Sequence, residues 1–394
     1  MTMTAVRRGG GALAGAACAL AWLLAAAPAR AQDNNGAPTA TAADSVADAP
    51  ARGGPRYYFY HPEQPYGTTG QFSPLNVIAT RGLSTLSWSS SERHPLRIDW
   101  GNGWANVWDA VAHPDAAVQR NGGWGHFLKQ EFGPVSWNVW EWAFAPNYSG
   151  HLVAGGITYR ALAEWYDAHG APVPRVLGGA TAMATILVNE AIESRSGTAG
   201  YASTMSDIYI FEPLGIALFS LDGVAAFFAD KLHAADWSPQ ASVTLPKLQI
   251  LNNAQQHSFH FGLPFVERAD LLFVTGQGSQ IGVLWDLDAE YAFGVAGGFT
   301  ANSQLLSDTS EESLIAKAGG GLYLSRDNSL LANLNVFRGG ETIAVLNVYP
   351  GALGGAMRDV GTWAMLNRGG DFSVGLSYRP MLGVGIGYDF WRAP

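Results

Sequence analysis

Residues 382–391 constrain the fold more than any other part of the chain. Successive side chains of a β-strand point to opposite faces, so this segment would have one apolar face and one face of glycine and aspartate. The apolar face holds Leu382, Val384, Ile386, Tyr388 and Phe390, and the opposite face holds Gly383, Gly385, Gly387 and Asp389. Such alternation up to an aromatic residue is typical of a strand that faces lipid on one side.

The same period of two recurs through residues 242–394, with glycine, aspartate and asparagine turns between the segments. The clearest alternating segments are 259–263, 281–287, 291–296, 332–336 and 372–378. We therefore predict an α+β chain in which this part is an antiparallel transmembrane β-barrel of about 8 to 12 strands. A soluble periplasmic β-sandwich would show the same alternation and remains the alternative.

Composition favours the membrane alternative. The chain has 48 Gly and 14 Trp, and only 14% of its residues are charged. Glycine-rich alternating strands and interfacial tryptophans are typical of outer-membrane barrels. The formal net charge of -9 argues against a nucleic-acid partner, which needs a basic face. The expected partners are outer-membrane lipids and the barrel-assembly machinery, with any periplasmic partner unknown.

Residues 1–31 have the pattern of a secretory signal peptide, so we expect export and an outer-membrane location. Arg7-Arg8 precedes an apolar stretch, and Ala29-Arg-Ala31 offers a cleavage site. A twin-arginine signal and a lipoprotein acylated at Cys18 are the alternatives. Cys18 is the only cysteine, so the processed chain would hold no disulfide and no thiolate. Residues 32–54 are small, polar and rich in proline and glycine, which predicts a disordered leader.

The middle of the chain changes period. Residues 55–150 form an irregular Trp-rich region, with a possible strand at 75–88 and a short helix at 106–112. Residues 151–235 follow a period near that of an α-helix and predict an inserted helical domain. Its helices are expected at 151–168, 175–193 and 206–230, the last kinked by Pro213 and Gly215.

The helical domain carries the polar residues that least resemble scaffolding. Our candidate acid/base or metal cluster is His151, Glu190 and Asp207, because histidine and carboxylates suit both chemistries. Neighbouring polar residues of the same cluster are Asn189, Glu193 and Ser206. In the structural interpretation, Glu190 and Glu193 instead face Arg160, Arg175 or Arg195, and Ser206 caps the third helix. The spacing matches no metal motif, so no metal or cofactor is expected.

Three resemblances add to this interpretation. Gly385, Tyr388 and Phe390 resemble the C-terminal assembly signal of bacterial outer-membrane barrels, although Arg392-Ala-Pro394 follows the aromatic residue. His151, then Asn189-Glu190-Ala-Ile-Glu193, then Ser206-Asp207 resemble an uncharacterised family of bacterial envelope proteins that joins a small helical domain to outer-membrane strands. That resemblance covers about residues 140–220 and implies architecture only.

Ser149-Gly-His151 and Ser194-Arg195 resemble membrane-associated acid phosphatases, but Tyr201 stands where that chemistry needs a nucleophilic histidine. We therefore expect a non-enzymatic envelope protein with a structural or small-solute passage role. The alternative is an envelope lipid-modifying hydrolase that uses His151, Glu190 and Asp207. The glycine face of the strands also predicts that the Trp-rich or helical region fills the space inside the barrel.

Overall fold

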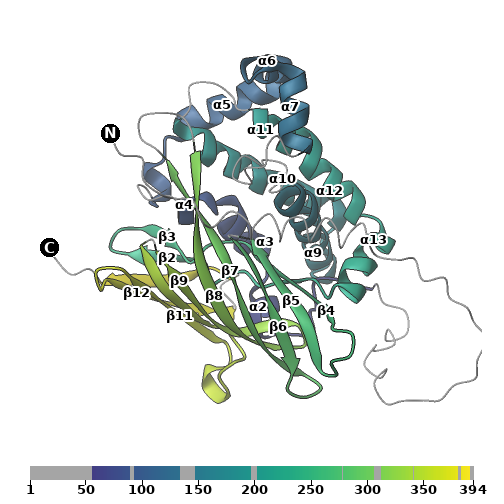
Figure 1. Ribbon diagram of the computed structural model, residues 1–394, viewed down its shortest axis with the longest axis vertical. Coiled ribbons are helices and arrows are strands. Elements are labelled where there is room, and N and C mark those ends of the chain that lie inside the picture. The colour runs from purple at the N-terminus through teal and green to yellow at the C-terminus, as the bar shows by residue number, and fades with distance from the viewer. Residues whose placement is uncertain are drawn as a thin grey trace, which may run out of the picture.

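The computed structural model describes residues 56–88, 93–133, 147–196, 202–276, 278–305, 312–339, 341–379 and 383–390. The predicted signal peptide and disordered leader lie outside these residues. The protein is α+β, with helices first in the chain and then thirteen strands in one sheet. Figure 1 shows α5–α13 gathered on one side of the sheet, while α2 lies among the strands.

The described residues between 67 and 132 form short helices joined by turns. The elements are α2 (Gly67–Gln71), α3 (Pro74–Val77), the π-helical turn η1 (Ile78–Gly82), α4 (Thr85–Trp88), η2 (Pro95–Arg97), α5 (Trp100–Ala112), α6 (Pro114–Arg120) and α7 (Gly123–Phe132). The predicted strand at 75–88 is therefore wrong. Ser73 accepts a hydrogen bond from the Asn76 amide, and Pro74 occupies the first turn, so local capping starts a helix here. The predicted helix at 106–112 is part of α5.

The second group of helices follows the sequence prediction more closely. Its elements are η4 (Asn147–Ala154), α9 (Gly155–Ala168), α10 (Pro174–Glu193), η5 (Ser194–Ser196), α11 (Ala202–Ser206), η6 (Asp207–Phe211), α12 (Glu212–Phe219), α13 (Asp222–Ala226) and η7 (Phe227–Lys231). The predicted single helix over 206–230 is wrong, because the chain bends by 84° between Ser203–Phe219 and Asp222–Lys231. Pro213 lies in the first turn of α12, a position that tolerates proline.

No single described helix is long and apolar enough to cross a membrane, whereas this bent pair meets the length and composition criteria when its two arms are taken together.

All strands pair in the order β1-β4-β5-β6-β7-β8-β9-β10-β11-β12-β13-β2-β3. They are β1 (Ala235–Asp236), β2 (Ser242–Leu245), β3 (Gln249–Leu251), β4 (Gln256–Gly262), β5 (Ala269–Gly276), β6 (Gly278–Asp286), β7 (Tyr291–Leu305), β8 (Glu312–Arg326), β9 (Ser329–Arg338), β10 (Thr342–Val348), β11 (Val360–Asn367), β12 (Phe372–Tyr378) and β13 (Gly385–Phe390). Neighbours are antiparallel except β13 and β2, which are parallel. Thirteen strands exceed the predicted number because β1–β3, absent from the prediction, flank the meander β4–β13.

The two ends of the sheet lie near each other in space. β1 ends one edge and β2–β3 the other, yet only residues 237–241 connect them, a length that spans at most about 22 Å. We call Trp237–Ala241 the crossing segment, because it runs along the inner face of the sheet. Gln240 Nε2 donates to the carbonyls of Val348 at 3.1 Å and Thr362 at 3.0 Å. The crossing segment is thereby fixed to β10 and β11.

The sheet has an apolar outer face and an inner face that carries both polar and apolar side chains. Buried polar side chains on the inner face are Gln280, Tyr323, Asn333, Asn335, Asn347, Asn367, Ser373, Ser377 and Asp389. Exposed apolar side chains on the outer face of β6–β13 are Ile281, Trp285, Val295, Leu322, Leu334, Val336, Leu346, Leu366, Phe372, Leu376, Tyr378, Ile386, Tyr388 and Phe390. The inner face also buries apolar side chains, among them Leu284, Trp363 and Met365, so what departs from a sheet in water is the exposed apolar outer face.

Helices cover the remaining part of the outer face, on β4 and β5. Phe259 of β4 and Phe273 of β5 belong to one buried cluster with Phe219 and Phe228 of the helices. The rings of Phe228 and Phe259 are 6.4 Å apart. The helical layer is therefore packed on the sheet at this edge and is not a separate unit.

The space beside the inward glycines is filled from two sources. Trp363 lies over Gly375 and Gly387, where a Cβ atom would clash with the indole ring. Residues of the N-terminal helices also approach the inner face, since Asn76 Nδ2 donates to the carbonyl of Gly383 at 2.7 Å. Gln71 of α2 donates a hydrogen bond to Ser377 on the inner face of β12, so part of the predicted Trp-rich region contacts that face.

Candidate functional site

The predicted site residues lie in a buried polar cluster between the helices. Three of its members sit on π-helical turns: Arg81 on η1, His151 on η4 and Asp207 on η6. A π-helical turn inserts one extra residue into a helix and is found most often at functional sites. The turns place these three side chains among α9, α10 and α12, whose facing residues are buried.

His151 and Asp207 form the centre of the cluster. His151 Nε2 lies 3.5 Å from Asp207 Oδ2. Burial, with a smaller contribution from the charge of Arg81, lowers the pKa of His151 to about 3. Burial, followed by the charges of Glu190 and Glu131, raises the pKa of Asp207 well above its ordinary value. Both shifts favour the uncharged forms, that is, a neutral imidazole beside a protonated carboxyl group. The pair therefore holds one proton that either side chain can carry.

The other predicted residues surround this pair in different ways. Glu190 is buried on α10 and acts on Asp207 through its charge. Glu193, one turn further, accepts hydrogen bonds from Asn189 Nδ2 at 2.6 Å and Thr85 Oγ1 at 3.0 Å. Burial raises the pKa of Glu193 as well. Burial therefore holds two carboxyl groups of the cluster, those of Asp207 and Glu193, toward their protonated form.

The structural interpretation of these residues is wrong in two details. The Ser206 hydroxyl caps no helix but donates to Glu131 Oε2 at 2.8 Å. Arg160 and Arg175 pair with carboxylates outside the candidate set: Arg160 binds Glu164 at 2.9 Å, and both arginines approach Asp222. These ion pairs do not involve Glu190 or Glu193, whereas the third arginine of that interpretation, Arg195, does act on Glu193, since its charge partly offsets the burial that raises the pKa of that carboxyl.

Sequence reasoning missed the strongest ion pair of the cluster. Arg81 makes two hydrogen bonds to Glu212, at 2.8 and 2.5 Å, and both side chains are buried. Gly155 makes room for it, since a Cβ atom there would lie 2.5 Å from Glu212 Oε2. The partners are 131 residues apart, and Arg81 lay in a segment predicted as a strand, so no local signal could pair them.

The cluster can move or store a proton, but its geometry does not suggest a metal centre. In the part of the chain that the structure describes, no three His, Cys, Asp or Glu side chains are placed to hold a metal ion. The His151–Asp207 pair resembles an acid/base pair in residue type and in its shifted pKa values.

The assembly-signal residues occupy β13. Gly385 is buried on the inner face, while Tyr388 and Phe390 are exposed on the outer face. The ring of Phe390 stacks on Phe372 of β12, with centroids 4.4 Å apart. The terminal strand therefore has the predicted two faces.

Fold and cluster together define an α+β protein in which a helical layer with a buried carboxyl-rich cluster packs on one largely antiparallel sheet. The chain matches no protein-family model, no curated protein and no solved structure.

Proposed function

We propose that this protein is an outer-membrane β-barrel protein of a Gram-negative envelope, with a non-enzymatic role in structure or in the passage of a small solute. The observation that carries the proposal is the outer face of β6–β13, whose large exposed side chains are apolar, while polar and apolar side chains share the buried inner face. Single exposed apolar residues are common on soluble proteins, but a continuous apolar face over neighbouring strands marks an interaction surface.

The size of this face argues for hydrocarbon as its environment. Leu376 on β12 is 60% exposed, and Ile386 on β13 is 55% exposed. Moving such side chains out of water stabilises a protein by roughly 1.5 to 3 kcal/mol each. Because the apolar face extends over β6–β13, the free energy gained by removing all of its side chains from water is far larger than the free energy that holds a single docked partner. Lipid satisfies all of these residues at once.

The course of the crossing segment supports a closed barrel. Sheet edges with unpaired backbone groups are not stable in hydrocarbon, so a sheet in a bilayer needs its edges joined or covered. Here residues 237–241 link one edge to the other, and helices pack on β4 and β5. In this arrangement lipid contacts β6–β13, and the helical layer covers the rest. Leu214 and Leu221 of the bent helix pair are exposed, consistent with a position at the membrane interface.

Fractionation and gel mobility test the proposal. We expect the protein in the outer-membrane fraction of an expressing cell, soluble only with detergent. An unheated sample should migrate differently from a boiled one, because a barrel resists unfolding by dodecyl sulfate at room temperature. Recovery in the periplasmic extract without detergent, and identical mobility before and after heating, would support the soluble protein instead.

The distance between His151 and Asp207 supports a second candidate, the envelope lipid-modifying hydrolase. Purified protein in detergent micelles should then release fatty acid or a headgroup from envelope lipid. Alanine at His151, Glu190 and Asp207 should abolish that release without changing gel mobility. Hydrolysis that survives the triple substitution, or that the unsubstituted protein lacks, rejects the enzymatic candidate.

A further inference from the structure

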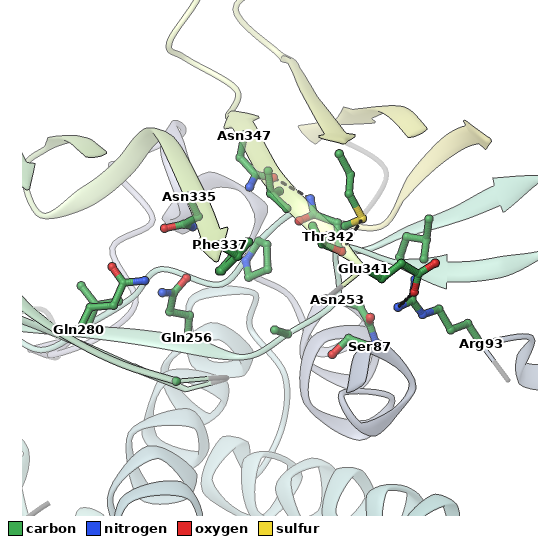
Figure 2. Close-up of a pocket in the computed structure, with 18 of the residues that line it drawn as sticks. Ser87, Arg93, Asn253, Gln256, Gln280, Asn335, Phe337, Glu341, Thr342 and Asn347 are labelled. Atoms are coloured by element: carbon green, nitrogen blue, oxygen red, sulfur yellow. Dashed lines mark hydrogen bonds and ion pairs between the residues drawn. The ribbon is translucent and has the colours of Figure 1, made fainter. Parts of the chain in front are cut away.

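A cavity of about 140 Å³ lies on the inner face of the sheet, where α4, the β3–β4 connection and strands β6, β9 and β10 meet. Figure 2 shows the side chains that line it. Six of them end in a carboxamide: Asn252, Asn253, Gln256, Gln280, Asn335 and Asn347. In the same view the amide ends of Gln256, Gln280 and Asn335 are turned toward one another. The cavity wall is therefore a dense set of neutral hydrogen-bonding groups.

Two of these carboxamides have one satisfied end and one unpartnered end. Asn253 Nδ2 donates to the carbonyl of Leu83 at 2.6 Å, but its Oδ1 has no hydrogen-bond partner. Asn347 Oδ1 accepts from Asn252 Nδ2 at 2.6 Å, but its Nδ2 has no partner. Both side chains are almost fully buried. Since the occupied ends fix the orientation of both amides, the cavity offers one unused acceptor and one unused donor.

A third contact fixes two more carboxamides. The Tyr323 hydroxyl lies 2.8 Å from Gln280 Oε1 and 2.9 Å from Asn335 Oδ1. Tyr323 is itself buried and belongs to the apolar cluster beneath the cavity. Gln280 and Asn335 are therefore held in place before any ligand arrives, which reduces the entropy lost on binding.

The charges at the cavity cancel. Among the described residues that line it, the charged ones are Arg93 and Glu341, which pair with each other at 3.3 Å. Phe337, Met365 and Val345 give the wall an apolar side. A charged ligand would find no unpaired opposite charge at this wall. An acyl chain would cover the carboxamides with hydrocarbon and leave their hydrogen-bonding groups without partners.

We propose that the cavity binds a neutral polyhydroxylated solute of monosaccharide size. Hydroxyl groups both donate and accept, so they can satisfy carboxamide oxygens and nitrogens together, while the CH face of a sugar ring packs on Phe337. The volume is roughly ten times the space that one water molecule needs. The inference goes beyond the membrane proposal, because binding depends on the inner face alone.

Calorimetric titration of the purified protein with D-glucose and D-galactose tests the inference. The detergent should be lauryldimethylamine oxide, because the headgroup of an alkyl glycoside would compete for the cavity. D-glucuronate and D-glucosamine serve as charged counterparts of the same ring. We expect saturable binding of at least one neutral sugar and at least tenfold weaker binding of the charged ones.

Variants locate the binding. Asn335→Leu and Gln280→Met remove carboxamides at nearly constant volume and should each weaken sugar binding about tenfold, the effect of one or two lost hydrogen bonds. Leu346→Ala lies beside Asn347 on the outer face and should leave binding unchanged. Heat-dependent gel mobility checks that every variant is folded. The inference is overturned if no neutral sugar binds, if both inner-face variants bind sugar as tightly as the unsubstituted protein, or if a charged sugar binds more tightly than the neutral ones.

Discussion

The shifted pKa of His151 predicts that this residue contributes to destabilisation of the protein by acid. Its pKa is 6.5 in an unfolded chain and about 3 in the folded protein. As the pH falls below 6.5, the unfolded state therefore takes up a proton that the folded state refuses. The contribution of His151 to stability is fully present above pH 6.5 and is lost as the pH falls toward 3.

The size of the effect follows from these two pKa values. Between pH 7 and pH 5 these two pKa values lower the free energy of unfolding by about 2 kcal/mol. This value is an upper bound, because solvent screens the 18% of the His151 side chain that is exposed. Asp207 acts in the opposite sense. Its raised pKa gives stability that is full at low pH and is lost as the pH rises through the folded pKa. A variant that removes only the histidine titration separates the two.

His151→Gln is that variant, because it keeps a polar group of similar reach and does not titrate. Urea unfolding, followed by circular dichroism at the helical band, gives the free energy of unfolding at each pH. The native protein should lose about 2 kcal/mol more than the variant between pH 7 and pH 5. NMR of protein labelled at the histidine rings should show one ring, absent from the variant, that stays neutral to pH 5. A native protein and variant with parallel pH profiles, or a His151 ring that titrates near 6.5, would refute the reasoning.

Three further predictions follow from buried or outward-facing contacts. Arg81→Met should lower the free energy of unfolding by about 3 to 5 kcal/mol, because Glu212 is left as an unpaired buried charge. A loss of less than about 1 kcal/mol in urea unfolding would contradict this expectation. Gly375→Ala should abolish heat-dependent gel mobility, because the added methyl group displaces the indole that lies over it; normal mobility would show that the inner face can adjust. Leu376→Lys should lower the free energy of unfolding by about 2 to 4 kcal/mol when the protein is in a bilayer. The control Leu96→Lys, at an 80% exposed position of the helical part, should change it by no more than about 0.5 kcal/mol. Equal effects of the two substitutions in urea titrations of protein folded in vesicles argue against lipid at β12.

The strands of the meander were predictable because their signal is local. Alternation within 281–287 or 372–378 decides which side chains share a face, and the structure has strands at both places. The same holds for the helices near 151–168 and 175–193, whose period extends over several turns. Residues 75–88 failed because the helices there are only a turn or so long, with too few residues to establish a period.

Long-range pairing could not be predicted. Nothing near Arg81 indicates Glu212, and nothing in 242–245 indicates that this strand lies parallel to the last one. The structure does bring His151 and Asp207 together, at 3.5 Å. Their role in chemistry remains a proposal, because proximity and shifted pKa values are shared by structural clusters.

The pairing of β2 with β13 sets an order of events during biogenesis. Thr244 and Asp389 bond to each other across 145 residues, so β2 has no partner on that side until the end of the chain has been made. The crossing segment can bind β10 and β11 through Gln240 before β13 is present, but β2, which directly follows it, still lacks its parallel partner at that stage. A chain that lacks β13 would therefore keep its inner face accessible to proteases and chaperones. Pairing of β13 with β2 would end this accessibility.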